Sequence, residues 1–109
     1  SIVLDTVIAK SDIVDFGARG YLTDWLPLYC TSSSTQNMVV LKNGERTPPQ
    51  IANKKYGQID GFIKPYLSND LQTVKIGDGE LLILVELDQT EPFAVGFDYQ
   101  DLGLLVTFE

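Results

Sequence analysis

The hydrophobic residues of this chain form one continuous run, residues 81–87, and several shorter segments in which apolar and polar residues alternate. The run Leu-Leu-Ile-Leu-Val-Glu-Leu is too short to span a membrane and too continuous for a strand with one face in water. It therefore predicts a central β-strand that is covered on both faces. The alternating segment 102–108 at the end of the chain predicts the neighbouring strand.

Two turn signals predict β-hairpins. Asn43-Gly44 stands between residues 38–42 and 45–47, and this dipeptide supplies the two positive-φ positions that a type I′ turn needs. Asp78-Gly79 stands between residues 71–76, which alternate in polarity, and the continuous apolar run. We therefore expect each turn to join two paired antiparallel strands.

The other segments carry weaker signals. Residues 2–9 alternate partly and predict a strand near a sheet edge. Residues 58–67 also predict a strand, which Pro65 limits to an edge or a strand end. Gly17 and Gly20 predict a turn or bulge, and residues 21–30 predict an irregular, extended crossover because Pro27 disfavours a long helix.

Together these segments predict an all-β fold. About seven short strands, with turn signals roughly every ten residues, are typical of an immunoglobulin-like antiparallel β-sandwich. The chain has 109 residues, which suits a single domain over residues 1–109. It starts with Ser1 in a strand-like segment, and we expect it to be excised from a longer chain with an N-terminal membrane anchor.

Composition excludes several function classes. The net charge is −7 and the sequence pI is near 4.3, so the chain is poorly suited to neutralising nucleic-acid phosphates or docking on an anionic membrane. Histidine is missing, which removes the usual general base and the commonest transition-metal ligand. Cys30 has no partner for an internal disulfide and is expected to be a small buried hydrophobe. We therefore expect no enzyme activity and no cofactor.

Four acidic residues flank one predicted loop. Carboxylate oxygens of this kind bind calcium in loops at the end of a β-sandwich, although the spacing does not match an EF-hand. A solvated acidic loop is the alternative interpretation. The calcium candidates are Asp88, Glu91, Asp98 and Asp101.

Large aromatic residues provide the other candidate site. Outside a regular strand pattern, such residues either close the end of a sandwich or stand exposed as a recognition surface. The N-terminal strand, which has few charges, offers a second route to partners through strand addition or self-association. The candidate partner-interface residues are Tyr21, Trp25, Tyr29, Phe62 and Tyr66.

The chain resembles the soluble domains of archaeal type IV pilin-like proteins, and among them the archaellum accessory proteins F and G. The resemblance rests on the strand-first start Ile2-Val3-Leu4 and on the two C-terminal apolar segments 81–87 and 102–108. It implies a membrane-anchored, extracytoplasmic β-sandwich of the cell envelope. It also implies non-enzymatic work in a filament or motor assembly, through self-association and contacts with filament or surface-layer proteins.

A second family resemblance keeps an alternative function open. The stretch Phe97-Asp98-Tyr99-Gln100-Asp101-Leu102 is similar to the ending of certain secreted calcium-associated β-domains. This resemblance implies association with calcium. The alternative function is therefore a secreted calcium- or carbohydrate-binding domain that uses the acidic loop. The sequence thus predicts a structural interaction module first and a secreted binding domain second.

Overall fold

The structure is a computed structural model of the 109-residue chain. It describes residues 5–9, 12, 14–21, 24–32, 35–52, 61, 63–87, 91–92, 97, 99–100 and 102–108. The regular elements among these residues are mostly strands, with two very short helices. The strands are arranged in two small antiparallel sheets, which agrees with an all-β fold.

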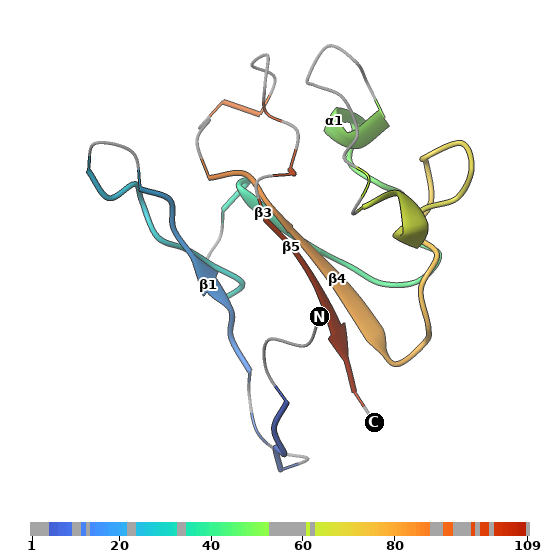
Figure 1. Ribbon diagram of the computed structural model, residues 1–109, viewed down its shortest axis with the longest axis horizontal. Coiled ribbons are helices and arrows are strands. Elements are labelled where there is room, and N and C mark those ends of the chain that lie inside the picture. The colour runs from blue at the N-terminus through green and yellow to red at the C-terminus, as the bar shows by residue number, and fades with distance from the viewer. Residues whose placement is uncertain are drawn as a thin grey trace.

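Figure 1 shows the three longer strands side by side, the two-stranded sheet on one side of them and the short helices on the other. The larger sheet has the strand order β3-β4-β5, and the smaller sheet pairs β1 with β2. None of the described helices is long and apolar enough to cross a membrane. The elements are β1 (Gly17–Ala18), β2 (Tyr29–Cys30), β3 (Met38–Leu41), α1 (Pro49–Ala52), the 3-10 helix η1 (Lys64–Tyr66), β4 (Glu80–Val85) and β5 (Leu102–Thr107).

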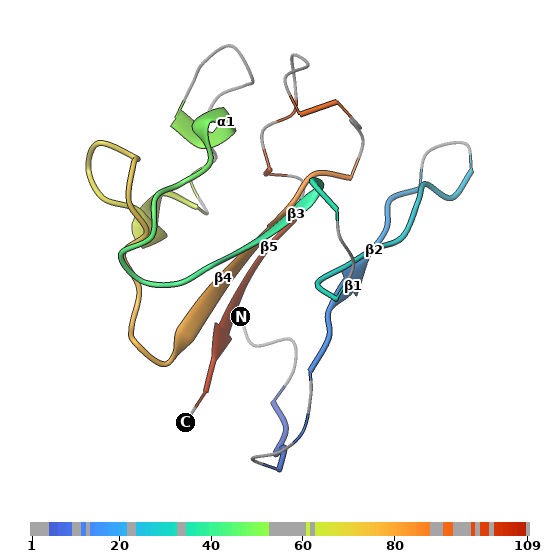
Figure 2. The ribbon, with the colours of Figure 1, turned by 180° about the vertical axis from the view of Figure 1, so that it is seen from behind.

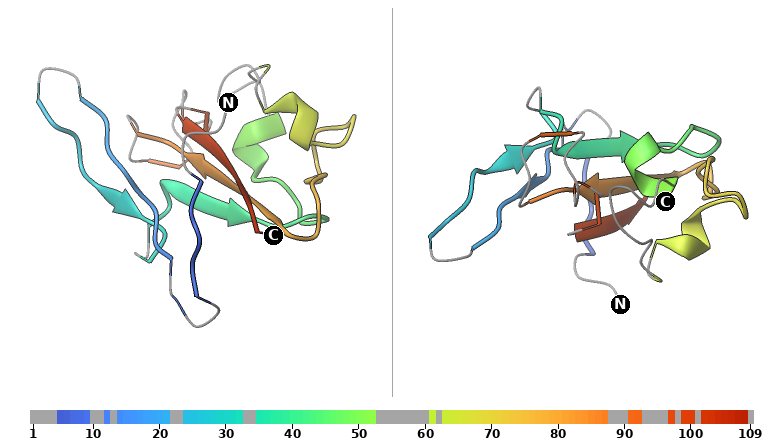
Figure 3. Two further views of the ribbon diagram at one scale, coloured as in Figure 1. Left: turned by 60° about the horizontal axis from the view of Figure 1, so that its bottom comes forward. Right: turned by 90° about the horizontal axis from the view of Figure 1, so that it is seen from above.

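The central strand predicted from the apolar run is confirmed as β4. It lies between β3 and β5, and the view from above in Figure 3 shows it in the middle of the sheet. Neighbouring residues of a strand point to opposite faces of the sheet, and Leu84 and Val85 are both completely buried. Both faces of β4 are therefore covered, and each such side chain contributes about 1.5–3 kcal/mol to stability.

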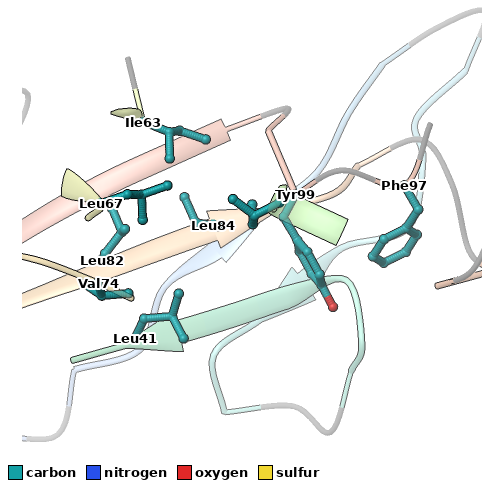
Figure 4. Packing of buried hydrophobic residues seen from close by; sticks show 9 residues of the cluster. Leu41, Ile63, Leu67, Val74, Leu82, Leu84, Phe97 and Tyr99 are labelled. Carbon is teal, nitrogen blue, oxygen red and sulfur yellow. The ribbon is translucent and has the colours of Figure 1, made fainter. Parts of the chain in front are cut away.

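One face of the sheet carries the larger hydrophobic core. Leu82 and Leu84 of β4 point into this core, together with Leu41 of β3. Figure 4 shows Ile63 and Leu67, from the region of η1, packed over the same face. The other buried members of this core are Ile51, Val74, Phe97 and Tyr99.

The opposite face of the three-stranded sheet carries the smaller hydrophobic core. Ile83 and Val85 of β4 form this second core with Met38, and the partly buried side chains of Phe16, Ala18 and Tyr29 pack against it. These three residues belong to the base of the two-stranded sheet. The two sheets thus contact each other through apolar side chains.

The prediction that residues 38–42 and 45–47 pair with each other is wrong. The turn exists, because the Glu45 N–H donates to the Lys42 carbonyl at 3.2 Å. Only Gly44, with φ of 85°, has positive φ in this turn, whereas type I′ requires it at both central residues. β3 pairs instead with the apolar β4, and Arg46 forms a bridge to Thr73.

The turn at Asp78-Gly79 precedes β4 as predicted, but residues 71–76 do not pair with that strand. Both edges of β4 are already occupied by β3 and β5. Val74 instead forms a bridge to Leu67, and its N–H donates to the Glu45 carbonyl at 2.8 Å. Its side chain is buried in the larger core.

Two other strand predictions fail where the structure describes them. Residues 64–66 form η1, and Pro65 fits its first turn because proline fixes φ near the helical value. Residues 5–9 form no strand, and Val7 is 96% exposed. The remaining residues of these two segments, 2–4, 58–60 and 62, lie outside the described part of the chain.

Candidate interaction surface

Residues 16–21 and 24–31 form the two arms of a hairpin, which corrects both the predicted turn at Gly17–Gly20 and the predicted crossover. In its sheet Gly17 pairs with Cys30 and Ala18 with Tyr29, and further along Tyr21 forms a bridge to Trp25. A Cβ atom on Gly17 would lie 3.3 Å from the Cys30 sulfur, so glycine allows the two strands to approach. Figure 2 shows this hairpin extending away from the three-stranded sheet.

Three large apolar side chains are exposed on this hairpin. Tyr21 is 60% exposed, and Trp25 and Leu28 are each 58% exposed. The Tyr21 and Trp25 rings meet edge to face, with centroids 5.1 Å apart and an interplanar angle of 72°. The Arg19 guanidinium carbon lies 4.3 Å from the centre of the Trp25 ring. We call these four residues, Arg19, Tyr21, Trp25 and Leu28, the hairpin surface.

The contacts within the hairpin surface hold its rings in place while leaving them in water. An edge-to-face aromatic pair is worth about 0.5–1.5 kcal/mol, and an exposed cation–π contact is worth about 0.5–1 kcal/mol. The Leu26 N–H also donates to the Gly20 carbonyl at 2.8 Å, and this hydrogen bond joins the two arms of the hairpin next to the rings. A partner that covers these side chains therefore has less conformational entropy to remove.

The five predicted interface residues do not share one environment. Tyr21 and Trp25 are exposed, so the interpretation that they close the end of a sandwich is wrong. Tyr29 is partly buried against the smaller core, and Tyr66 is partly buried against the larger one. Phe62 lies outside the described residues. Of the four predicted residues that the structure describes, it brings Tyr21 and Trp25 together on the surface.

The base of the hairpin is fixed by the carboxylate of Asp15. Asp15 accepts hydrogen bonds from the Thr31 hydroxyl, the Ser32 hydroxyl at 2.6 Å and the Ser32 N–H at 2.8 Å. The Ser32 hydroxyl bond, followed by the Thr31 hydroxyl bond, lowers the pKa of Asp15 below its ordinary value of 3.8. The ionised carboxylate therefore stabilises the folded hairpin.

This lowered pKa predicts an acid-sensitive contribution to stability. A carboxylate with a lower pKa in the folded state stabilises fully above its unfolded pKa, and this stabilisation is lost as the pH falls through the folded value. We expect Asp15→Asn to lower the free energy of unfolding at neutral pH, and the difference to be smaller at an acidic pH below the ordinary value of 3.8. Urea unfolding at both pH values measures this. The control Asp5→Asn removes the same charge from an exposed residue, and an equal effect there would contradict the prediction.

The calcium prediction falls mainly on residues that the structure does not describe. Asp88, Asp98 and Asp101 lie outside the described residues, and Glu91 is exposed. Within the described ranges, no three His, Cys, Asp or Glu side chains are grouped so that they would hold a metal ion. The calcium site stays a prediction from the sequence.

Sequence reasoning missed two members of the hairpin surface. Arg19 lies between the two glycines that predict a turn or bulge, and Leu28 is one of several apolar residues in the segment 21–30 that predicts a crossover. Both residues could have been found if the segment had been recognised as a hairpin in which Tyr21 pairs with Trp25. The sequence does not indicate this hairpin, because Gly17, Gly20 and Pro27 are poor strand formers.

A second missed group is buried and polar. Glu86 follows β4 and is 1% exposed, and its carbonyl accepts a hydrogen bond from the Asn37 side chain at 2.9 Å. Nearby in the fold, the Tyr99 hydroxyl donates to the Gln36 carbonyl at 2.5 Å. Burial, and then the Glu86 carboxylate, raises the pKa of Tyr99, so its phenol stays a neutral donor at physiological pH. The single glutamate within the apolar run was the signal for this group.

Comparison with known proteins gives no match: no family model, no curated protein and no solved structure is similar to this chain.

Proposed function

We propose that this protein is a non-enzymatic interaction module that binds a protein partner through the hairpin surface. The observation that carries the proposal is the exposure of Tyr21 and Trp25, whose rings are in contact, and of Leu28 on the same hydrogen-bonded hairpin. Single exposed apolar residues are common, whereas contiguous exposed apolar patches mark interaction sites. Trp, Tyr and Arg are also the residue types that contribute most to protein–protein affinity.

The environment of Trp25 favours a protein partner. The guanidinium of Arg19 lies over the Trp25 ring, which leaves less of the ring face free for stacking on a planar or sugar ligand. Arg19 keeps donors available at the rim of the same surface. An apolar centre with a polar rim is the usual composition of a protein interface.

For the setting, we propose an extracytoplasmic filament or motor assembly of the archaellum type. The support is the resemblance of the strand-first start and the two C-terminal apolar segments, together with an acidic composition with net charge −7. We also propose that the two sheets belong to an immunoglobulin-like sandwich of about seven strands. The apolar contact between the hairpin base and the smaller core supports this arrangement.

A photo-crosslinking experiment tests the proposed surface. A photoreactive phenylalanine analogue at position 28, introduced in cells that make the protein, is expected to give one discrete polypeptide adduct. The same analogue at position 7, where Val7 is 96% exposed, should give none. Equal labelling from both positions, or no adduct from position 28, would contradict the proposed surface.

We expect the substitution Trp25→Ser to lower partner affinity strongly while the chain stays folded. We expect partner affinity to fall about thirtyfold or more, because interface aromatic residues are typically worth about 2 kcal/mol or more. The free energy of unfolding should fall by only about 1–2.5 kcal/mol, because the variant loses the exposed aromatic pair and the cation–π contact but no buried contact of the core. Adduct yield from position 28 and urea unfolding measure the two effects. A variant that unfolds while losing the adduct would assign Trp25 a structural role instead.

A further inference from the structure

β5 forms one edge of the three-stranded sheet, and among the described residues it pairs only with β4. Two hydrogen bonds show which way its backbone points. The Glu86 N–H donates to the Asn37 carbonyl at 2.7 Å, so even-numbered residues of β4 face β3. The Phe108 N–H donates to the Gly79 carbonyl at 2.8 Å, so odd-numbered residues of β4 face β5.

In an antiparallel strand the N–H and C=O of one residue point the same way, and this direction alternates along the strand. Leu104 and Val106, like Phe108, therefore direct their backbone groups toward β4. Gly103, Leu105 and Thr107 direct theirs away from the sheet. Their N–H and C=O groups form a row to which another strand can pair.

The described residues of this edge lack the features that normally prevent strand addition. Protected edges carry charged residues, proline or a bulge. β5 contains no charged residue and no proline, and its register with β4 is continuous from Leu102 to Thr107. The side chain of Leu105, in the middle of the row, is 38% exposed.

We propose that the partner at this edge is a second copy of the chain, with the two β5 strands antiparallel around a two-fold axis at Leu105. Gly103 then pairs with the partner subunit's Thr107, and Leu105 pairs with the partner subunit's Leu105. All three outward-facing residues of both copies form hydrogen-bonded pairs, about six bonds in total. The two three-stranded sheets become one continuous sheet.

The chemistry of β5 favours this partner. The strand is self-complementary, because its outward-facing residues are symmetric about Leu105. Leu104 also lies opposite the partner subunit's Val106, which extends the partly buried row that packs against the smaller core. Each copy carries a net charge of −7, but none of this charge lies on β5, and added salt is expected to strengthen association.

The dimer uses none of the residues of the hairpin surface. Substitutions in β5 test the dimer, and substitutions at Trp25 test the proposed function. Failure of one proposal therefore leaves the other intact.

Cysteine crosslinking tests the two-fold register. In a Cys30→Ser background, Leu105→Cys is expected to oxidise to a covalent dimer of twice the 12.1 kDa chain mass. Directly paired Cα atoms lie about 5.5 Å apart, within the range of about 4.4–6.8 Å that a disulfide needs. The control Thr107→Cys should give no self-crosslink, because the two copies of that residue lie about 13 Å apart along the strands. Equal crosslinking of both variants would overturn the proposed register.

A proline substitution tests the hydrogen bonding itself. Leu105→Pro removes only an outward-facing N–H, so β5 should stay paired with β4 while dimer affinity falls at least about tenfold. Sedimentation equilibrium measures the affinity, and circular dichroism verifies the fold. The matched control is Val40→Pro on the other edge strand, where Val40 is 39% exposed and its N–H also points outward. This control should leave the dimer intact.

If Leu105→Pro does not fold, Leu105→Lys replaces it, because two lysines then meet at the axis and should prevent association. The proposal would be overturned if the parent chain stayed monomeric at about 1 mM. A dimer with a dissociation constant of this size has a binding free energy of about −4 kcal/mol. Protection from hydrogen exchange of the Gly103, Leu105 and Thr107 amides in such a monomer would show that the chain's own segment occupies the edge. Loss of the dimer in Val40→Pro alone would assign the interface to β3 and equally overturn it.

Discussion

Replacing Leu84 with Asp is expected to abolish folding. Leu84 is 0% exposed and lies in the middle of β4, between two strands and beneath the larger core. Burying an unpaired carboxylate there, while losing the leucine contacts, costs about 5 kcal/mol or more, which is comparable to the whole stability of a domain of this size. Far-UV circular dichroism and urea unfolding at neutral pH measure the outcome.

The control for this experiment is Val7→Asp, which places the same charge on a residue that is 96% exposed. Its free energy of unfolding should stay within about 0.5 kcal/mol of the parent value. If Leu84→Asp unfolded as cooperatively and at the same urea concentration as the parent, β4 would not be covered on both faces. The layered arrangement of the sheet would then have to be abandoned.

The second large effect is expected for Phe97→Ala. Phe97 is 0% exposed and meets the Tyr99 ring edge to face, with centroids 4.9 Å apart. Removing its ring leaves a cavity, and such substitutions cost about 3–5 kcal/mol. For a chain of this length, this lowers Tm by about 12 °C or more. Differential scanning calorimetry measures the shift.

Tyr99 makes this site more sensitive than an ordinary core position. Its φ of 58° is unusual for a residue with a side chain, and such a conformation persists only where packing enforces it. The matched control is Phe108→Ala, because Phe108 is 46% exposed, and we expect a cost of about 1 kcal/mol or less. Similar losses for the two variants would show that Phe97 is not part of the core.

The sequence predicted the central strand and its C-terminal neighbour because their apolar residues leave few alternatives. A run such as residues 81–87 has to be buried on both sides, and the alternation in residues 102–108 identifies the face of β5 that packs on the smaller core. These predictions depend on residue type alone. Long-range partners were not needed to make them.

The predictions from the sequence are wrong where the structure depends on which strands pair with each other. Asn43-Gly44 marks a turn, but it does not show that β3 pairs with β4, which lies far along the chain. Residues 71–76 alternate like a strand, yet the edges of β4 were taken by other strands. Local signals give turns and faces, whereas pairing is settled by competition for the same central strand.

The candidate site was found only in part for a related reason. Aromatic residues in the segment around Trp25 were recognised, but periodicity does not show which of them point to water once Gly17 and Gly20 lie in a hairpin. The pairing of Tyr21 with Trp25 and the position of Arg19 over the ring decide this, and both depend on the folded backbone.

The position of Trp25 has a consequence for how unfolding of this protein is observed. Trp25 is the chain's one tryptophan, and its indole already faces solvent in the native state. Its fluorescence should be accessible to iodide before any denaturant is added, and its emission should shift little when the core melts. Tryptophan emission therefore reports contact at the hairpin, while tyrosine absorbance or backbone dichroism is the better probe of the fold.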